Sequence, residues 1–156
     1  MSIIVGGVYG RFWEPDSKIP CTAPPFGELV AVNANTGDIA WRVPLGFNEK
    51  LEEKGIKNTG SLTLGGSMTT ASGLVFIAAT GDRRFRAFDG KTGIELWVGF
   101  IGADAKAAPM TYMGRDGRQY VVIMAGGGLQ LSGSTPAPGA GRNLVAFALP
   151  AAAPPR

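Results

Sequence analysis

Residues able to do chemistry are scarce in this chain of 156 amino acids. It contains no histidine and a single cysteine, Cys21, which excludes a Ser-His-Asp triad, a Cys-His pair, histidine-ligated zinc and an internal disulfide framework. General-base chemistry would have to come from carboxylates, either one in an activating environment or two acting as a pair. We find no such pair and expect no catalytic residue and no metal site; the acids in question are Asp82, Asp89, Glu95, Asp104 and Asp116.

Two further clusters could contact a charged ligand. Residues 126–128 are three consecutive glycines, but no Lys-Ser/Thr pair follows them to open a helix, so they are no phosphate-binding loop. Arg83, Arg84 and Arg86 form a small basic cluster. Strand alternation puts Arg84 and Arg86 on one face, where they could bind an anion. Such clusters are more often a solvated sheet face or protection of a sheet edge, and this is the interpretation we adopt.

The composition indicates which elements position these residues. Apolar residues make up 45% of the chain and charged residues 17%, which suits one domain with a packed core. The 24 glycines and 11 prolines show no collagen period and therefore predict many turns joining short strands. A net charge of +3 is too small to indicate a nucleic-acid-binding surface. The chain lacks a long apolar run and a signal-peptide pattern, so we expect a soluble chain without an export signal.

An internal repeat is the most informative feature. Residues 29–41 read LVAVNANTGDIAW, and residues 85–97 read FRAFDGKTGIELW. Each copy predicts a strand, a polar turn containing Thr-Gly, and a second strand that ends on a tryptophan, Trp41 or Trp97. The repeat therefore predicts two β-hairpins of the same design.

The remaining chain predicts further short strands. Asn48 could cap a short helix that ends at Gly55. The methionines Met110, Met113 and Met124 fall in strands and are interpreted as core. In total we expect nine or ten strands and at most one helix. The strands, besides the repeat, are expected within 67–80, 108–113, 119–125 and 143–149, with loops over 98–108 and 126–142.

The repeat and its surroundings resemble a known family. The pattern Ala87-x-Asp89-x-x-Thr92-Gly93-x-x-x-Trp97 is similar to the tryptophan-docking motif of quinoprotein propellers, and the copy ending at Trp41 has asparagine in place of aspartate. The ordered segments 21–33, 55–89, 108–128 and 144–150 resemble the C-terminal part of pyrroloquinoline quinone (PQQ) dependent dehydrogenases of the membrane glucose dehydrogenase type.

The resemblance implies an all-β fold of antiparallel four-stranded blades from an eight-bladed β-propeller, with about two blades present. Residues 1–27 would be the N-terminal segment of a truncated blade, 28–149 two blades with docking motifs, and 150–156 a disordered tail. In the family, the docking tryptophan packs between blades and its indole hydrogen-bonds a neighbouring turn. Trp41 and Trp97 are therefore expected to be structural.

The resemblance also implies a function. The parent would be a periplasmic oxidoreductase that uses PQQ and calcium to oxidise a sugar or polyol and passes electrons to a quinone. The family places its catalytic base and calcium ligands in earlier blades, so this chain is expected to be inactive alone and to bind the missing N-terminal blades or copies of itself. The alternative is a non-catalytic blade module that self-associates or binds a partner chain through exposed sheet edges, and in which this fragment binds no cofactor.

Two segments are expected by resemblance to face the cofactor. The first is Leu64, Gly65 and Gly66, where some relatives carry an aromatic residue in place of Leu64; its plainer interpretation is a bulge at the start of a strand. The second is Gly127 and Gly128, where several relatives have a histidine. Because this chain has Gly128 there, any polar contact of that histidine is lost.

Overall fold

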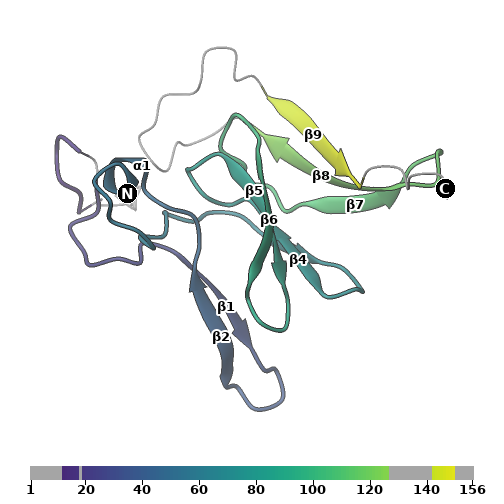
Figure 1. Cartoon of the computed structure of the whole chain (residues 1–156), viewed down its shortest axis with the longest axis horizontal. Helices are drawn as coiled ribbons and strands as arrows, with labels where there is room; N and C mark the ends of the chain where they lie inside the picture. Colours follow the sequence, from purple (N-terminus) through teal and green to yellow (C-terminus); the bar gives the residue numbers. More distant parts are fainter. Residues whose placement is uncertain (1–11, 18, 127–141, 150–156) are drawn as a thin grey trace, which may run out of the picture.

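The computed structural model describes residues 12–17, 19–126 and 142–149 (Figure 1). This part of the chain contains nine strands in three antiparallel sheets and one four-residue helix. The all-β prediction is confirmed, and so is the expected number of strands. Within the described ranges, no helix has the length and hydropathy needed to cross a bilayer.

The first sheet is the hairpin of the first repeat copy. It pairs β1 (Glu28–Val32) with β2 (Ile39–Pro44). Gly37 has a φ of 79° in the turn, a left-handed conformation that glycine adopts without steric cost. Asn33 fixes the same turn, because its side-chain oxygen accepts from the N–H of Asn35 at 3.0 Å.

The second sheet is a complete four-stranded meander. Its order is β3 (Ser67–Thr69), β4 (Leu74–Ile77), β5 (Arg84–Asp89) and β6 (Glu95–Phe100). The sequence predicted a loop from residue 98, but the strand continues to Phe100, which pairs with Arg84. Pairing with β5 overrides the local preference for a loop, and Gly99 leaves room for the ring of Trp97 above it.

The third sheet has three strands. It is formed by β7 (Met110–Met113), β8 (Gln119–Ala125) and β9 (Asn143–Ala148), in that order. The short helix α1 (Glu49–Glu52) lies between the first and second sheets in the sequence, and Asn48 caps it as predicted.

Each core lies between two neighbouring sheets. Leu45, Ile77, Ala79 and Phe88 form the first core, against which Leu29 and Val43 of the first sheet pack. The second core joins the second and third sheets, and its largest members are Phe85, Ile101 and Ile123 with Phe147 packed against them. Strand β5 supplies residues to both cores, so both of its faces are covered. The sheets therefore follow one another in chain order, with β3–β6 in the middle (Figure 1).

The outer face of the third sheet carries exposed apolar side chains. Met110, Met113 and Met124 were expected in the core, but all three are exposed. Met124 pairs with Leu144, which is 67% exposed, so these two side chains share one face. For Met110 and Met124 the prediction was wrong because the opposite face of β8, which carries Ile123, is the one that packs against the second sheet. Met113 pairs with Gln119 and lies on the Ile123 face, but it is the last residue of β7 and remains exposed there.

Candidate functional site

The segment Leu64, Gly65 and Gly66 forms a bulge, here called the 64–66 bulge. Thr63 makes an antiparallel bridge with Thr80, and Ser67 pairs with Ile77. Three residues on one side of this ladder therefore face two residues, 78 and 79, on the other. The bulge occupies the start of β3, as the plainer interpretation expected. A contact between this segment and a cofactor stays a prediction.

Both glycines of the 64–66 bulge are required by close packing. A Cβ on Gly65 would lie 2.9 Å from the backbone oxygen of Lys106, and φ at Gly65 is 153°. A Cβ on Gly66 would lie 3.0 Å from the Cβ of Ala108. The glycines thus let the bulge lie directly against the segment that precedes β7.

Leu64 supplies the exposed apolar side chain of the bulge. Its backbone N–H donates to the carbonyl oxygen of Ala79 at 2.8 Å, which fixes the residue, while 51% of its surface remains exposed. An exposed leucine beside two glycines offers an apolar surface and an accessible backbone, which suits contact with a flat ligand.

The second predicted segment, Gly127 and Gly128, lies outside the described residues. The structure describes its start: the N–H of Gly126 donates to the carbonyl oxygen of Asp104 at 2.9 Å.

A buried ion pair was missed by the sequence analysis. Asp82 and Arg86 are 1% and 3% exposed, and the guanidinium contacts both carboxylate oxygens. Arg86 also donates through Nε to Glu95 at 3.0 Å and through Nη1 to the hydroxyl of Thr80 at 3.2 Å. A signal was available, since Asp82 and Arg86 are opposite charges four residues apart at the start of a strand.

The predicted solvated basic cluster is therefore wrong. The guanidinium of Arg86 is buried against Asp82, Thr80 and Glu95 rather than directed to solvent. Arg83 pairs with Glu49 at 2.9 Å, and Arg84 stacks on the ring of Phe47, 4.6 Å from its centroid. All three guanidinium groups already have protein partners, which leaves no open anion site in this cluster.

Trp41 links the first and second sheets. Its indole N–H donates to the carbonyl oxygen of Gly90 at 3.0 Å. Its ring lies on Gly93, where a Cβ would come within 2.7 Å of Trp41 Cε3. Trp41 thus contacts the Thr-Gly turn of the second repeat copy through both its polar and its apolar atoms.

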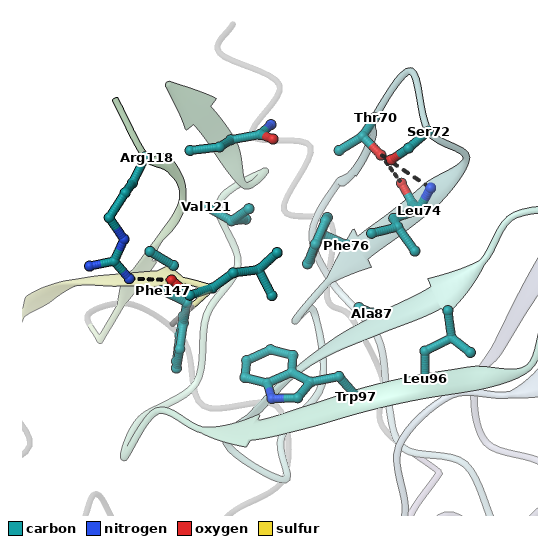
Figure 2. Close-up of a pocket in the computed structure, with 13 residues that line it drawn as sticks. Thr70, Ser72, Leu74, Phe76, Ala87, Leu96, Trp97, Arg118, Val121 and Phe147 are labelled. Carbon is teal, nitrogen blue, oxygen red and sulfur yellow. Dashed lines mark hydrogen bonds between the residues drawn. The ribbon is translucent and has the colours of Figure 1, made fainter. Parts of the chain in front are cut away.

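Trp97 has different surroundings. It packs edge-on against Phe147 of β9, with 4.9 Å between ring centroids, and edge-on against Phe85 at 6.0 Å. Among the described residues, its indole nitrogen has no hydrogen-bond partner. Trp97, Phe76 and Phe147 line an apolar groove of about 700 Å³ between the second and third sheets (Figure 2).

Other acids serve turns. Asp89 accepts from the N–H and the hydroxyl of Thr92 and from the N–H of Lys91, and these hydrogen bonds hold its pKa below the ordinary 3.8. The hydroxyl of Tyr120 donates to Asp116 at 2.8 Å, which lowers the pKa of Asp116 and raises that of Tyr120. In the described ranges, no three His, Cys, Asp or Glu side chains come together as a metal site.

Comparison with known proteins agrees with this architecture. Residues 5–121 match the family described as PQQ glucose/ethanol/alcohol dehydrogenase, beta-propeller domain. The chain is 44% identical over 138 residues to a probable quinate dehydrogenase (quinone) of Xanthomonas campestris pv. juglandis, covering 85% of this chain and 17% of that protein. It is 36% identical over 137 residues to the quinoprotein glucose dehydrogenase of Escherichia coli (strain K12), covering 85% of this chain and 16% of that protein.

A solved structure has the same fold. The quinohemoprotein alcohol dehydrogenase of Comamonas testosteroni superposes with a TM-score of 0.53 at 34% identity, over 71% of this chain and 14% of that one. The chain thus spans about one sixth of the curated relatives it matches. Its sheets are propeller blades, and the resemblance drawn from the docking repeat is confirmed. The chain belongs to the β-propeller family of PQQ-dependent glucose, ethanol and alcohol dehydrogenases.

Proposed function

We propose that the chain is the C-terminal propeller portion of a PQQ-dependent oxidoreductase that oxidises a sugar or polyol. Family membership supplies the reaction class. The observation that carries the role of this portion is the 64–66 bulge, where an exposed Leu64 stands on two glycines packed against the next segment. It would form one apolar wall of the cofactor site, with Gly127 and Gly128 as a second contact.

In this proposal the 64–66 bulge would form part of the quinone site, and calcium would be held outside the part of the chain that the structure describes. Leu64 can pack against a flat ring and exclude water from it, and the backbone around Gly65 and Gly66 is too tightly packed to move away. PQQ, when bound, accepts the hydride from the substrate. Four of the candidate acids are engaged in ion pairs or turns, namely Asp82, Glu95, Asp89 and Asp116. We therefore propose that calcium and the catalytic base come from other blades.

The substrate class rests on the named relatives. Curated proteins similar to the chain include quinate/shikimate dehydrogenase of Acinetobacter baylyi, glycerol dehydrogenase large subunit of Gluconobacter oxydans and quinoprotein glucose dehydrogenases. Quinate, glycerol and glucose all carry several hydroxyl groups. This common chemistry supports a sugar or polyol as the parent's substrate. The names of two relatives specify a quinone, which supports a quinone as the parent's electron acceptor. The periplasmic location is proposed from the family resemblance alone.

The chain is proposed to work together with further blades. Among the described residues, the third sheet has three strands and the first has two, against four in the sheet between them. The outer face of the third sheet exposes Met110, Met124 and Leu144. Missing N-terminal blades or further copies of the chain would cover these surfaces, and the chain alone would be inactive. In this proposal Trp41 is a docking tryptophan, and residues 28–149 are the blade-forming part.

A non-catalytic module is the second candidate. Sheet edges that have no partner strand within the described ranges, together with the apolar faces, favour self-association whether or not a cofactor is present. This candidate requires a stable assembly that does not bind PQQ.

Cofactor titration separates the two candidates. PQQ is added to the 156-residue chain with calcium, and quenching of tryptophan fluorescence is followed. The proposal expects saturable quenching that is weakened by Leu64→Asp. Ile56→Asp is the matched control, because Ile56 is similarly exposed (47%) and lies outside the bulge. Saturable quenching unaffected by Leu64→Asp would remove the bulge from the site, and no quenching with the wild-type chain would favour the non-catalytic module.

A further inference from the structure

We propose that the buried Asp82–Arg86 ion pair is a positioning device that holds the 64–66 bulge in its ligand-facing shape. This inference rests on the proposed function, because it gives the bulge a cofactor to face. The pair itself does not touch the ligand surface; it acts through the backbone of residues 79–82.

The ion pair is closed on every side. Asp82 accepts from Arg86 through both carboxylate oxygens and from the hydroxyl of Thr80 at 2.6 Å. Arg86 donates in addition to Glu95, whose side chain is 43% exposed and caps the network toward solvent. A Cβ on Gly46 would lie 3.0 Å from the Asp82 carboxylate, so the backbone of the preceding loop closes the remaining side.

The network is tied directly to the bulge. Thr80, which hydrogen-bonds both members of the pair, makes the antiparallel bridge with Thr63. The adjacent Ala79 accepts the N–H of Leu64 at 2.8 Å, and the N–H of Gly81 donates to the hydroxyl of Ser61 at 3.3 Å. Each of the three residues 79–81 is therefore bonded to the segment 61–64.

The backbone of residues 79–83 is strained at both ends. Ala79 has a φ of 47° and Arg83 a φ of 59°, left-handed values that residues with a Cβ rarely adopt. A residue keeps such a backbone conformation only where several surrounding contacts hold it there. Ala79 and Arg83 flank the stretch containing Thr80 and Asp82, so the ion pair is placed to hold both turns.

A buried ion pair is weak evidence for added stability, because desolvation offsets its attraction. Removing one partner, however, leaves an unpaired buried charge, and the local backbone must rearrange to reach solvent. The rearrangement would release Ala79 first and the Leu64 hydrogen bond with it. The expected effect is local and is measurable at one amide.

The test compares hydrogen exchange at the Leu64 amide in the wild-type chain and two variants. Asp82→Asn removes the charge, and Thr80→Val removes the hydroxyl but keeps the ion pair. Both are expected to speed exchange at Leu64 by about tenfold, a typical size for coupling between neighbouring sites. Exchange at the amide of Asn33, bonded to Asp38 in the first hairpin, should stay unchanged. Thr80→Ser restores the hydroxyl and should restore slow exchange.

Glu49→Gln is the control for loss of an ion pair as such, because it breaks the exposed contact with Arg83. It should leave the Leu64 amide unchanged. If Asp82→Asn does not fold, Thr80→Val against Thr80→Ser decides the matter alone. Unchanged Leu64 exchange in a folded Thr80→Val chain would overturn the proposal.

Titration with PQQ keeps this inference distinguishable from the proposed function. A wild-type chain that binds PQQ, with Thr80→Val binding several-fold more weakly and Thr80→Ser as wild type, supports both. Equal binding by all three overturns the positioning role. A wild-type chain that does not bind PQQ, with Leu64 exchange still responding to Thr80→Val, overturns the cofactor site and supports the positioning geometry.

Discussion

The indole N–H of Trp41 donates to the carbonyl oxygen of Gly90 at 3.0 Å and joins the first two sheets, although 49 residues separate the two in sequence. This contact is made by the tryptophan of the first copy of the repeat. Trp97, at the equivalent position of the second copy, packs on Phe147 of the third sheet instead.

Trp41→Phe tests the hydrogen bond. Phenylalanine retains most of the aromatic contact with Gly93 but leaves the Gly90 carbonyl without its donor, which should lower the free energy of unfolding by about 1 kcal/mol. Trp97→Phe is the matched control and should cost less, because no described residue accepts from its indole nitrogen. Urea unfolding measures both, and equal losses would argue against a specific role for the Gly90 contact.

Gly93→Ala tests the fit between the Trp41 ring and the turn. Gly93 has a φ of 73°, and a Cβ there would lie 2.7 Å from the ring. Gly37→Ala is a close match in the first copy, since φ is 79° and no atom lies within 4 Å of its Cβ. Both should lose about 1 kcal/mol from the left-handed backbone, and Gly93→Ala should lose roughly 1–3 kcal/mol more from overpacking. Thermal or urea unfolding that gives equal losses would contradict the ring contact.

The Asp89 turn predicts a pH dependence. Hydrogen bonds from Thr92 and Lys91 hold the pKa of Asp89 below its ordinary value of 3.8. Its contribution to stability is therefore present above pH 3.8 and is lost as the pH falls through the lower pKa of the folded chain. Asp89→Asn, which copies Asn33 of the first repeat, should be less sensitive to acid over this range. Thermal unfolding between neutral pH and pH below 3.8 measures the difference, and parallel curves for both proteins would contradict it.

The outer face of the third sheet predicts association. Leu144→Lys places a charge on the face that also carries Met124 and should shift an assembly toward smaller species in light scattering. Ile56→Lys, at another exposed apolar residue, should not. A wild-type chain that remains a monomer at all concentrations would show that this face does not bind copies of the chain.

Much of the fold could be predicted from the sequence because its turns carry strong local signals. Hairpins are specified within a few residues by the Thr-Gly turns at Gly37 and Gly93 and by the Gly114–Gly117 turn. The alternation of apolar and polar residues then predicts the strands on either side of each turn. The end of β6 was misplaced since the small residues there resemble a loop, whereas pairing with β5 decides the structure.

The spacing of Asp82 and Arg86 could have indicated an ion pair, but its burial could not be predicted from the sequence. A strand pattern places Arg84 and Arg86 on one face without saying that another sheet covers Arg86. Left-handed backbone at Ala79 and Arg83 has no sequence signal, because neither residue favours it. The prediction that Met110 and Met124 belong to the core was wrong for a related reason. Alternation divides the residues of a strand between two faces, but packing against other sheets decides which face is covered.

Co-elution with cofactor tests the central claim most directly. The chain is run on size-exclusion chromatography with light scattering, with and without PQQ and calcium, and quinone absorbance is followed across the protein peak. We expect quinone to elute with an associated form of the wild-type chain and to be lost with Leu64→Asp. Quinone that elutes apart from a stable wild-type assembly would contradict the claim that this chain forms part of a PQQ site.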